Sequence, residues 1–307
     1  MATLWADAHI FVYHRFGDSR YPSTNTTKDE LNKEFNYFKN NGYKVISLEK
    51  LVNALKKGDN IPDNWVILTI DDSFKSFYEN GLDIFKRYGY PFSLFVYVEA
   101  SLRGYHDYLS FAQLKEISKY GSLEFHSYEH PHLTKLSDNR VKEDFKKGLS
   151  IFEKELKIRP KYYSYPYGEY TSRIKKIAKS FGFDAIINQN MGAIGKGSDI
   201  YDLDRNALVG KTNLRYLLGF KHLNATWTKP KFFPKDGILK TVYIKTQENA
   251  KDGLLYISKN GWRKVRLKNG NIDVKLNIKL AKLRNRVIIS IKNRISTKLL
   301  IKDNAWN

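Results

Sequence analysis

The chain has 307 residues, of which 42% are hydrophobic, with a formal net charge of +21 and no cysteine. A chain of this composition can bury a large core, so general disorder is excluded, as are disulfide bonds and thiolate metal sites. No apolar run approaches the ~18–20 residues that cross a bilayer, so we expect no transmembrane segment.

Strands and helices alternate through the first 220 residues. Apolar strands are expected at 9–14, 45–48, 65–70, 92–98, 123–125, 162–165 and 183–188. A capping box at Thr27 and Glu30 begins the first helix, and further helices are expected at 74–88, 110–120, 138–156, 171–181 and 211–220. Because several strands are apolar throughout, as buried parallel strands are, the pattern predicts an α/β domain over residues 7–221, either a barrel or a doubly wound sheet.

The character of the sequence changes after about residue 222. Residues 222–237, rich in Pro, Lys and Phe, are expected to form a linker. Residues 238–307 are predicted to form a small antiparallel β-sandwich, because turns such as Asn260-Gly261 and Asn269-Gly270 separate short strand candidates. These candidates are 242–245, 254–258, 264–267, 272–278, 286–292 and 299–302.

The positive charge is concentrated in this second part. Residues 221–307 hold 21 Lys and Arg against 5 Asp and Glu. Such a surface could meet an anionic polymer or a membrane surface, or it could simply be solvated. Nucleic acid is not expected as a partner, because no aromatic platform accompanies the lysines. Trp262, in a turn, could stack on a sugar or could lie at the rim of the sandwich core.

Polar side chains end several strands of the first part. Loops at the carboxyl ends of parallel strands converge on one face, so these side chains are expected to share one rim. They are His14 after the first strand, Asp71 and Asp72 after 65–70, His126 and His130 after 123–125, and Tyr167 after 162–165.

The adjacent aspartates indicate a cation. Two neighbouring carboxylates disfavour joint ionisation unless a positive charge compensates them. Two imidazoles and one carboxylate make a three-ligand site for a divalent metal, and the other aspartate could then accept a proton. Each residue also has a simpler explanation: the aspartates as a helix N-cap, His14 as a hydrogen-bonded buried histidine, and Tyr167 as a packing residue.

Three segments, in this order, resemble the motifs of the NodB-homology polysaccharide deacetylases, carbohydrate esterase family four. They are Thr69-Ile70-Asp71-Asp72, His126-Ser127-x-x-His130 and Tyr165-Pro166-Tyr167-Gly168. The resemblance covers roughly residues 9–220. It implies an irregular (β/α)7 barrel, followed here by the expected Ig-like sandwich. It also implies a hydrolase that removes N-acetyl groups from an N-acetylglucosamine polysaccharide, such as an exopolysaccharide or peptidoglycan.

The resemblance further implies a role for each motif residue. Asp72, His126 and His130 would bind a divalent metal, most often zinc, with nickel, cobalt or iron as alternatives. Asp71 would be the general base that activates water, and the backbone N–H of Tyr167 would donate to the oxyanion. The third motif would contact the substrate through Tyr165, Pro166 and Tyr167.

The sequence departs from the family pattern at several positions. Ser73 replaces the usual Gly, and Ser164 replaces an arginine that pairs with the base, for which Arg205 is a candidate substitute. A Leu-x-His motif for the general acid is missing, since His222 lies in the wrong context, so His14, the protonated Asp71 or another group could supply the acid. These departures leave open a catalytically inactive, NodB-like carbohydrate-binding or cell-wall-associated protein.

The compartment is inferred from the expected partner, an acetylated glycan polymer. Such polymers lie in the periplasm or at the cell surface, so a periplasmic or secreted protein is expected. The first residues are too few to form a complete signal peptide, and no signal is visible.

Overall fold

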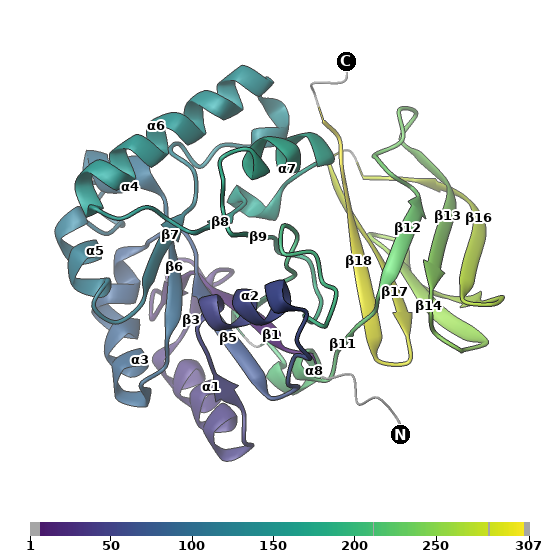
Figure 1. Ribbon diagram of the computed structural model, residues 1–307, viewed down its shortest axis with the longest axis horizontal. Coiled ribbons are helices and arrows are strands. Elements are labelled where there is room, and N and C mark those ends of the chain that lie inside the picture. The colour runs from purple at the N-terminus through teal and green to yellow at the C-terminus, as the bar shows by residue number, and fades with distance from the viewer. Residues whose placement is uncertain (1–6, 211, 282, 304–307) are drawn as a thin grey trace.

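The computed structural model describes residues 7–210, 212–281 and 283–303. Two units lie side by side, an α/β unit built from the first 220 residues and an all-β unit built from the rest (Figure 1). Among the described residues, no helix combines the length and the apolar character needed to span a bilayer.

A parallel sheet forms the centre of the α/β unit. Its strands follow the order β10-β1-β5-β6-β7-β8-β9, and β4 pairs with the beginning of β5. All residues of β1 and β6 are buried, because apolar side chains point to both faces and both faces are covered. The strands are β1 (His9–Tyr13), β4 (Lys44–Val45), β5 (Trp65–Ile70), β6 (Phe92–Val96), β7 (Ser122–Phe125), β8 (Tyr162–Ser164), β9 (Ala185–Ile187) and β10 (Asn206–Ala207).

The two edges of this sheet approach each other through one segment. Leu203 makes a parallel bridge to Ile187 of β9, and Asn206, three residues later, pairs with Phe11 of β1. The segment 203–207 therefore connects both edges, and the sheet curves into an irregular barrel. The predicted α/β barrel is confirmed.

Helices cover the outer side of this sheet (Figure 1). The capping box is confirmed, since the Thr27 side chain accepts from the N–H of Glu30, and Glu30 accepts from the N–H of Thr27. The predicted helix at 74–88 consists of a π-helical turn, Phe77–Gly81, followed by α3. The helices are α1 (Lys28–Asn40), α2 (Leu48–Lys57), α3 (Leu82–Tyr88), α4 (Val98–Arg103), α5 (Phe111–Ile117), α6 (Asp138–Leu156), α7 (Ser172–Lys179) and α8 (Leu214–Leu218).

The second unit is a sandwich of two sheets. One sheet has the order β11-β18-β17-β14-β15 and the other β12-β13-β16, and apolar residues of both sheets form one shared core. Each of the six predicted strands overlaps a strand of the structure. These are β13 (Ile238–Thr246), β14 (Asp252–Ile257), β15 (Gly261–Arg266), β16 (Asn271–Lys279), β17 (Arg284–Ile291) and β18 (Arg294–Ile301).

The expected linker at 222–237 is wrong in its first half. β11 (Lys221–His222) pairs with β18, and β12 (Ala225–Lys229) pairs with β13. Both strands are too short to give a clear alternating pattern, so they could not be predicted from the sequence. The all-β unit begins at Lys221, and the limits of independently folding domains stay a prediction.

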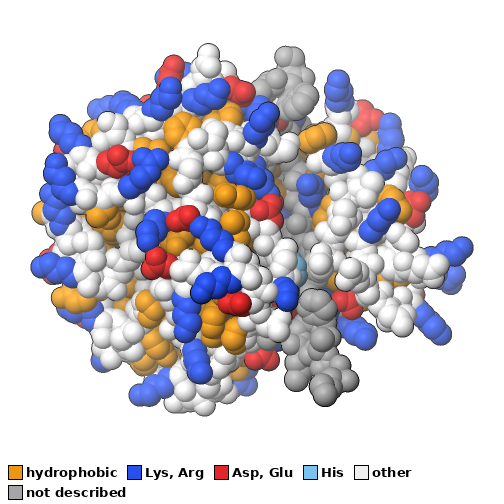
Figure 2. Space-filling view, in the orientation of Figure 1, with side chains coloured by type: hydrophobic (Ala, Val, Ile, Leu, Met, Phe, Trp, Pro, Cys, Tyr) orange, Lys and Arg blue, Asp and Glu red, His pale blue; other side chains and the backbone are white. Residues whose placement is uncertain are grey.

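Strand β18 lies against the α/β unit (Figure 1). The Thr297 hydroxyl of β18 donates to the carbonyl of Met191 at 2.7 Å, and the guanidinium of Arg173 on α7 pairs with Asp303 at 2.9 Å. Lys and Arg side chains outnumber acidic ones on the visible surface of the sandwich (Figure 2). The sandwich thus carries on its surface the Lys and Arg residues expected from the sequence, next to the barrel.

Candidate metal and catalytic site

The carboxyl ends of neighbouring strands deliver the site residues. β5 runs directly into Asp71 and Asp72, and β7 runs into His126. The backbone amide of Asp71 donates to the Tyr13 carbonyl, and that of His126 donates to the Val96 carbonyl. The barrel register therefore holds both segments on one rim, as the sequence predicted.

Three side chains converge on one point of this rim. The Oδ1 atom of Asp72 lies 3.3 Å from Nε2 of His126 and 3.1 Å from Nε2 of His130, and the two nitrogens are 3.2 Å apart. All three ligand atoms lie within 4.8 Å of one another. Two imidazoles and a carboxylate at this spacing fit a divalent metal with further positions for water or substrate.

A hydrogen bond fixes the tautomer of His126. Its Nδ1 atom lies 2.8 Å from the carbonyl oxygen of Ser164, to which it donates. The Nε2 lone pair is therefore free to face Asp72 and His130. Metal-binding histidines are commonly oriented in this way.

Left-handed backbone conformations gather at the site. Nine non-glycine residues of the described chain have positive φ; four of them belong to the three motifs, and a fifth, Ser73, directly follows the first motif. Such conformations cost of order 1–3 kcal/mol each in a non-glycine residue. The strain is thus concentrated where the side chains must converge. The five residues are Asp72, Ser73, Ser127, His130 and Tyr167.

The loop between the two histidines is anchored by Asp144 of α6. Its carboxylate accepts the backbone N–H of Tyr128 at 3.1 Å and that of Glu129 at 2.8 Å. Asp144 is buried, and nothing in the charged pattern of the predicted helix at 138–156 distinguished it from its neighbours. Sequence reasoning missed this residue.

We expect Asp144→Ala to destabilise the loop between His126 and His130, because it leaves the buried N–H of Tyr128 and the partly buried N–H of Glu129 without acceptors. Each buried N–H group without an acceptor lowers the free energy of unfolding by about 1–3 kcal/mol. Loss of a group that orients the metal ligands weakens metal affinity by about 10–100-fold. Metal titration and urea unfolding would measure both effects. Glu143→Ala, an exposed neighbour on the same helix, is the control. Equal behaviour of the two variants would contradict this role for Asp144.

The carboxylate of Asp71 is clamped by Arg205. The two guanidinium nitrogens donate to its two oxygens at 2.8 and 2.7 Å, and both side chains are fully buried. Arg205 also donates to the hydroxyl of Ser164 at 2.6 Å. The structure therefore places Arg205 where the sequence analysis expected a partner for Asp71, with Ser164 beside it.

The ion pair decides the protonation of Asp71. Burial alone would raise the pKa of this carboxyl, but the charge and hydrogen bonds of Arg205, aided by His126, lower it to about 2. Asp71 is therefore ionised at neutral pH. Its Oδ2 atom also accepts from the Gln189 amide at 3.3 Å, a contact that sequence reasoning missed because the segment 188–205 has no periodic pattern.

His14 lies in the same pocket but is not one of the three converging side chains. Its Nδ1 atom is buried without a partner, and burial lowers the pKa of the ring, although the charges of Asp72 and Asp71 oppose this. The ring is thus a neutral group beside the two carboxylates. Its role as a general acid stays a prediction.

Tyr167 forms the exposed edge of the site. Its ring lies 4.5 Å from that of His130 and stacks on that of His132 at 4.3 Å, while His132 pairs with Glu169 at 2.7 Å. Within the described chain, the N–H of Tyr167 donates to no protein group, although the N–H of Gly168 does. A free N–H beside the histidines can donate a hydrogen bond to an oxygen on which negative charge develops.

Two of the expected substrate contacts are wrong as side-chain contacts. Tyr165 is fully buried and stacks on Tyr170 at 4.6 Å, and Pro166 is also buried. Both side chains pack in the core beneath the rim.

Trp262 is 48% exposed, on β15 of the sandwich, apart from the three motifs. His222 donates its N–H to Asp7 next to the start of β1, which agrees with its exclusion as the general acid.

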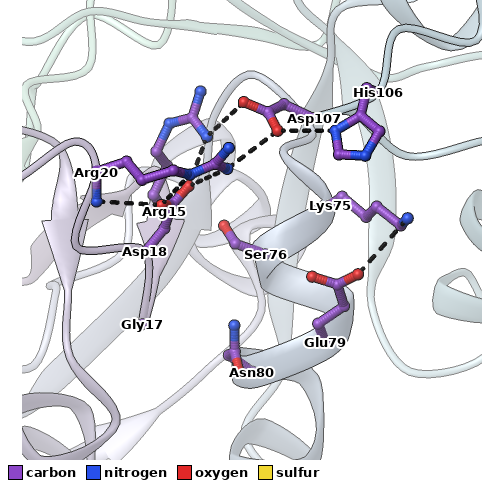
Figure 3. Close-up of a pocket in the computed structure, with 10 residues that line it drawn as sticks. All are labelled: Arg15, Gly17, Asp18, Arg20, Lys75, Ser76, Glu79, Asn80, His106 and Asp107. Atoms are coloured by element: carbon purple, nitrogen blue, oxygen red, sulfur yellow. Dashed lines mark hydrogen bonds and ion pairs between the residues drawn. The ribbon is translucent and has the colours of Figure 1, made fainter.

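A separate cavity of about 200 Å³ is lined by other residues, among them Arg15, Asp18 and Asp107 (Figure 3). Its charges are already compensated, because Asp18 pairs with Arg15 and Arg20 at 2.9 Å, and Asp107 pairs with Arg20 at 3.0 Å. The cavity therefore offers no unpaired charge to a ligand.

Comparison with known proteins identifies the class of this barrel. Residues 58–186 match the family model "Polysaccharide deacetylase". This segment contains Asp71, Asp72, both histidines and Tyr167. The match shows a polysaccharide deacetylase domain in this part of the chain, and the observed fold agrees with it.

Individual relatives agree with this assignment. YxkH of Bacillus subtilis, named as a polysaccharide deacetylase, is 23% identical over 64% of this chain and 69% of its own length. The poly-beta-1,6-N-acetyl-D-glucosamine N-deacetylase of Escherichia coli is 31% identical over 74 residues, which are 24% of this chain but only 11% of that protein. The Streptococcus pyogenes deacetylase PplD has the same fold, with a TM-score of 0.62 and 22% identity over 67% of this chain and 94% of its own.

Proposed function

We propose that the protein is a metal-dependent hydrolase that removes N-acetyl groups from a polysaccharide containing N-acetylglucosamine. The observation that carries this proposal is the convergence of Asp72, His126 and His130 beside the buried, ionised Asp71. Relatives named as deacetylases support the reaction class, and one is named for an N-acetylglucosamine polymer.

The donor set fits zinc best, with nickel, cobalt or iron as alternatives, because imidazole and carboxylate suit all four. A divalent metal held there would polarise the acetyl carbonyl and lower the pKa of a water molecule. Asp71 would accept the proton of the attacking water, since its Oδ2 atom lies 3.9 Å from Nε2 of His126. Arg205 would hold that carboxylate in place through its two hydrogen bonds to Asp71.

The remaining steps use the other residues of the rim. The free N–H of Tyr167 would donate to the oxygen that becomes negative as the acetyl carbon turns tetrahedral. The leaving amine then needs a proton, which His14 or the protonated Asp71 would return to it. Deacetylation would release acetate and leave an amine on the polymer.

The location and the partners follow from this substrate. An acetylated glycan polymer places the protein in the periplasm, at the cell surface or outside the cell. Trp262 would offer a stacking surface for a sugar ring. The alternative of an inactive, carbohydrate-binding barrel is disfavoured by the complete constellation of Asp71, the converging ligands and Arg205.

We expect His130→Ala to lose both bound metal and acetate release. Wild-type protein should hold about one metal ion per chain and release acetate from an N-acetylglucosamine oligomer, whereas the variant should do neither. Elemental analysis and an acetate assay measure these properties. His106→Ala, whose side chain is 92% exposed, is the matched control. A variant that keeps its metal and its activity would contradict the proposal.

A further inference from the structure

Two arginines of the sandwich reach the catalytic rim. From β17, Arg284 donates through Nη1 to the carbonyl of Tyr167 at 2.8 Å, and Arg286 donates through Nη2 to the carbonyl of Gln189 at 3.1 Å. Gln189 in turn contacts Asp71. The sandwich therefore forms one wall of the site, and Gln189 links Arg286 to Asp71.

These two arginines have no acidic side chain in direct contact among the residues that the structure describes. Within the described chain neither forms an ion pair, although both are partly buried, and the Nε atom of each is buried without a hydrogen-bond partner. Burial, and then the neighbouring charge of Arg284, lowers the pKa of Arg286 to about 10. Glu169, the acidic group that acts on Arg284, forms its hydrogen bond with His132 and makes no ion pair with Arg284.

Two adjacent, partly buried cations without a partner are unfavourable unless an anion joins them. Guanidinium groups bind carboxylates and phosphates through paired hydrogen bonds, which are stronger than neutral ones. This is the same argument, with the charges reversed, that connects the two aspartates with a metal. The two guanidinium groups together can therefore bind an anion.

An aromatic surface continues from the arginines along the same face of the sheet. Tyr256 of β14 pairs with Trp262 of β15 and with Ile288 of β17, so these three side chains point to the same face of the sheet. Arg286 lies two residues before Ile288 on β17 and therefore points to that face as well. The rings of Tyr256 and Trp262 are 5.2 Å apart. A sugar chain could therefore stack on the aromatic pair while a charged group reaches the arginines.

We propose that Arg284 and Arg286 bind an anionic group of the substrate, so that the preferred substrate is an acidic acetylated glycan rather than a neutral one. This specificity rests on the proposed deacetylase function. A polymer of N-acetylglucosamine alone gains only amines as it is deacetylated, and the arginines would repel its product. A glycan with carboxylates or phosphates would keep its attraction to this wall.

The test compares three acetylated oligosaccharides of equal length. They are a neutral N-acetylglucosamine oligomer, one alternating with glucuronate, and one joined by phosphodiesters. Arg286→Gln removes the charge but keeps an N–H donor for the Gln189 carbonyl. We compare kcat/KM for an acidic substrate with kcat/KM for the neutral one. The variant should lower this ratio by roughly tenfold, which corresponds to the loss of one hydrogen bond to a charged group. The two acidic substrates distinguish carboxylate from phosphate as the bound group.

Two controls separate specificity from other effects. Lys275→Gln removes an exposed charge from β16 in the opposite sheet and should leave the ratio unchanged. Arg286→Lys should keep part of the preference. A ratio that is unaltered in Arg286→Gln, or that falls equally in Lys275→Gln, would overturn the inference in favour of a structural or general charge effect.

Direct binding separates this inference from the proposed function. Calorimetry should show that Arg286→Gln binds the glucuronate oligosaccharide roughly tenfold more weakly than the wild type does. If no glycan releases acetate but this difference holds, the deacetylase proposal fails and the anion site stands. If acetate is released but neither binding nor the ratio changes, the anion site fails and the deacetylase stands.

Discussion

Asp71→Asn is expected to reduce acetate release by about 10²–10⁴-fold, the usual contribution of a positioned general base. The variant should still bind metal, because Asp72, His126 and His130 keep their ligand atoms. The amide has the same shape as the carboxylate but cannot accept a proton from water at neutral pH. Activity should therefore be lost while the site keeps its metal.

The assay must separate chemistry from unfolding. Arg205 would lose its charged partner in this variant, so acetate release is measured per bound metal at a temperature where circular dichroism shows folded protein. Asp83→Asn, whose side chain is 90% exposed on α3, is the control and should retain activity. Unchanged turnover in Asp71→Asn would show that another group is the base.

Arg205→Gln is expected to lower the free energy of unfolding by about 3–5 kcal/mol, because it leaves Asp71 as an unpaired charge in a fully buried position. Acetate release should also fall, since the base loses its fixed orientation. Urea unfolding measures the stability change. Arg103→Gln, an exposed pair with Glu99, should cost no more than about 1 kcal/mol.

The same variant should change the response to acid. Burial raises the pKa of Asp71, but Arg205 lowers it to about 2, below its ordinary value of 3.8. A lowered carboxyl pKa in the folded state adds stability above about pH 4, and this stability is lost as the pH falls towards about 2. Without Arg205 the pKa of Asp71 rises, so the folded variant should lose its stability at a higher pH than the wild type does. Identical acid unfolding of variant and wild type would contradict the ion pair.

The sequence was sufficient for the site residues that sit at strand ends. The run at 65–70 predicted a buried strand, and a buried parallel strand must deliver its next residues, Asp71 and Asp72, to the carboxyl rim. His126 followed from the same rule. Arg205 was predicted only as a substitute for the arginine that the family pattern has where this chain has Ser164. Its position in the segment that closes the barrel could not be inferred from periodicity.

Other features depend on tertiary contacts that leave no local pattern. Asp144 lies on a charged helix whose residues look alike until the loop at 126–130 packs against one of them. Tyr165 follows a strand like the site residues do, but its ring turns into the core. Arg284 and Arg286 resemble any basic strand residues, and only the docking of the sandwich brings them to the rim. Long-range packing, not local propensity, decides each of these cases.

The most direct test of the central claim is the release of acetate from an N-acetylglucosamine oligomer by the purified protein, before and after its metal is removed with a chelator and then restored. We expect release by the metal-containing protein, loss after chelation and recovery with zinc or another divalent ion of the same class. No release from any acetylated glycan by fully metal-loaded, folded protein would contradict the account and leave an inactive, carbohydrate-binding barrel.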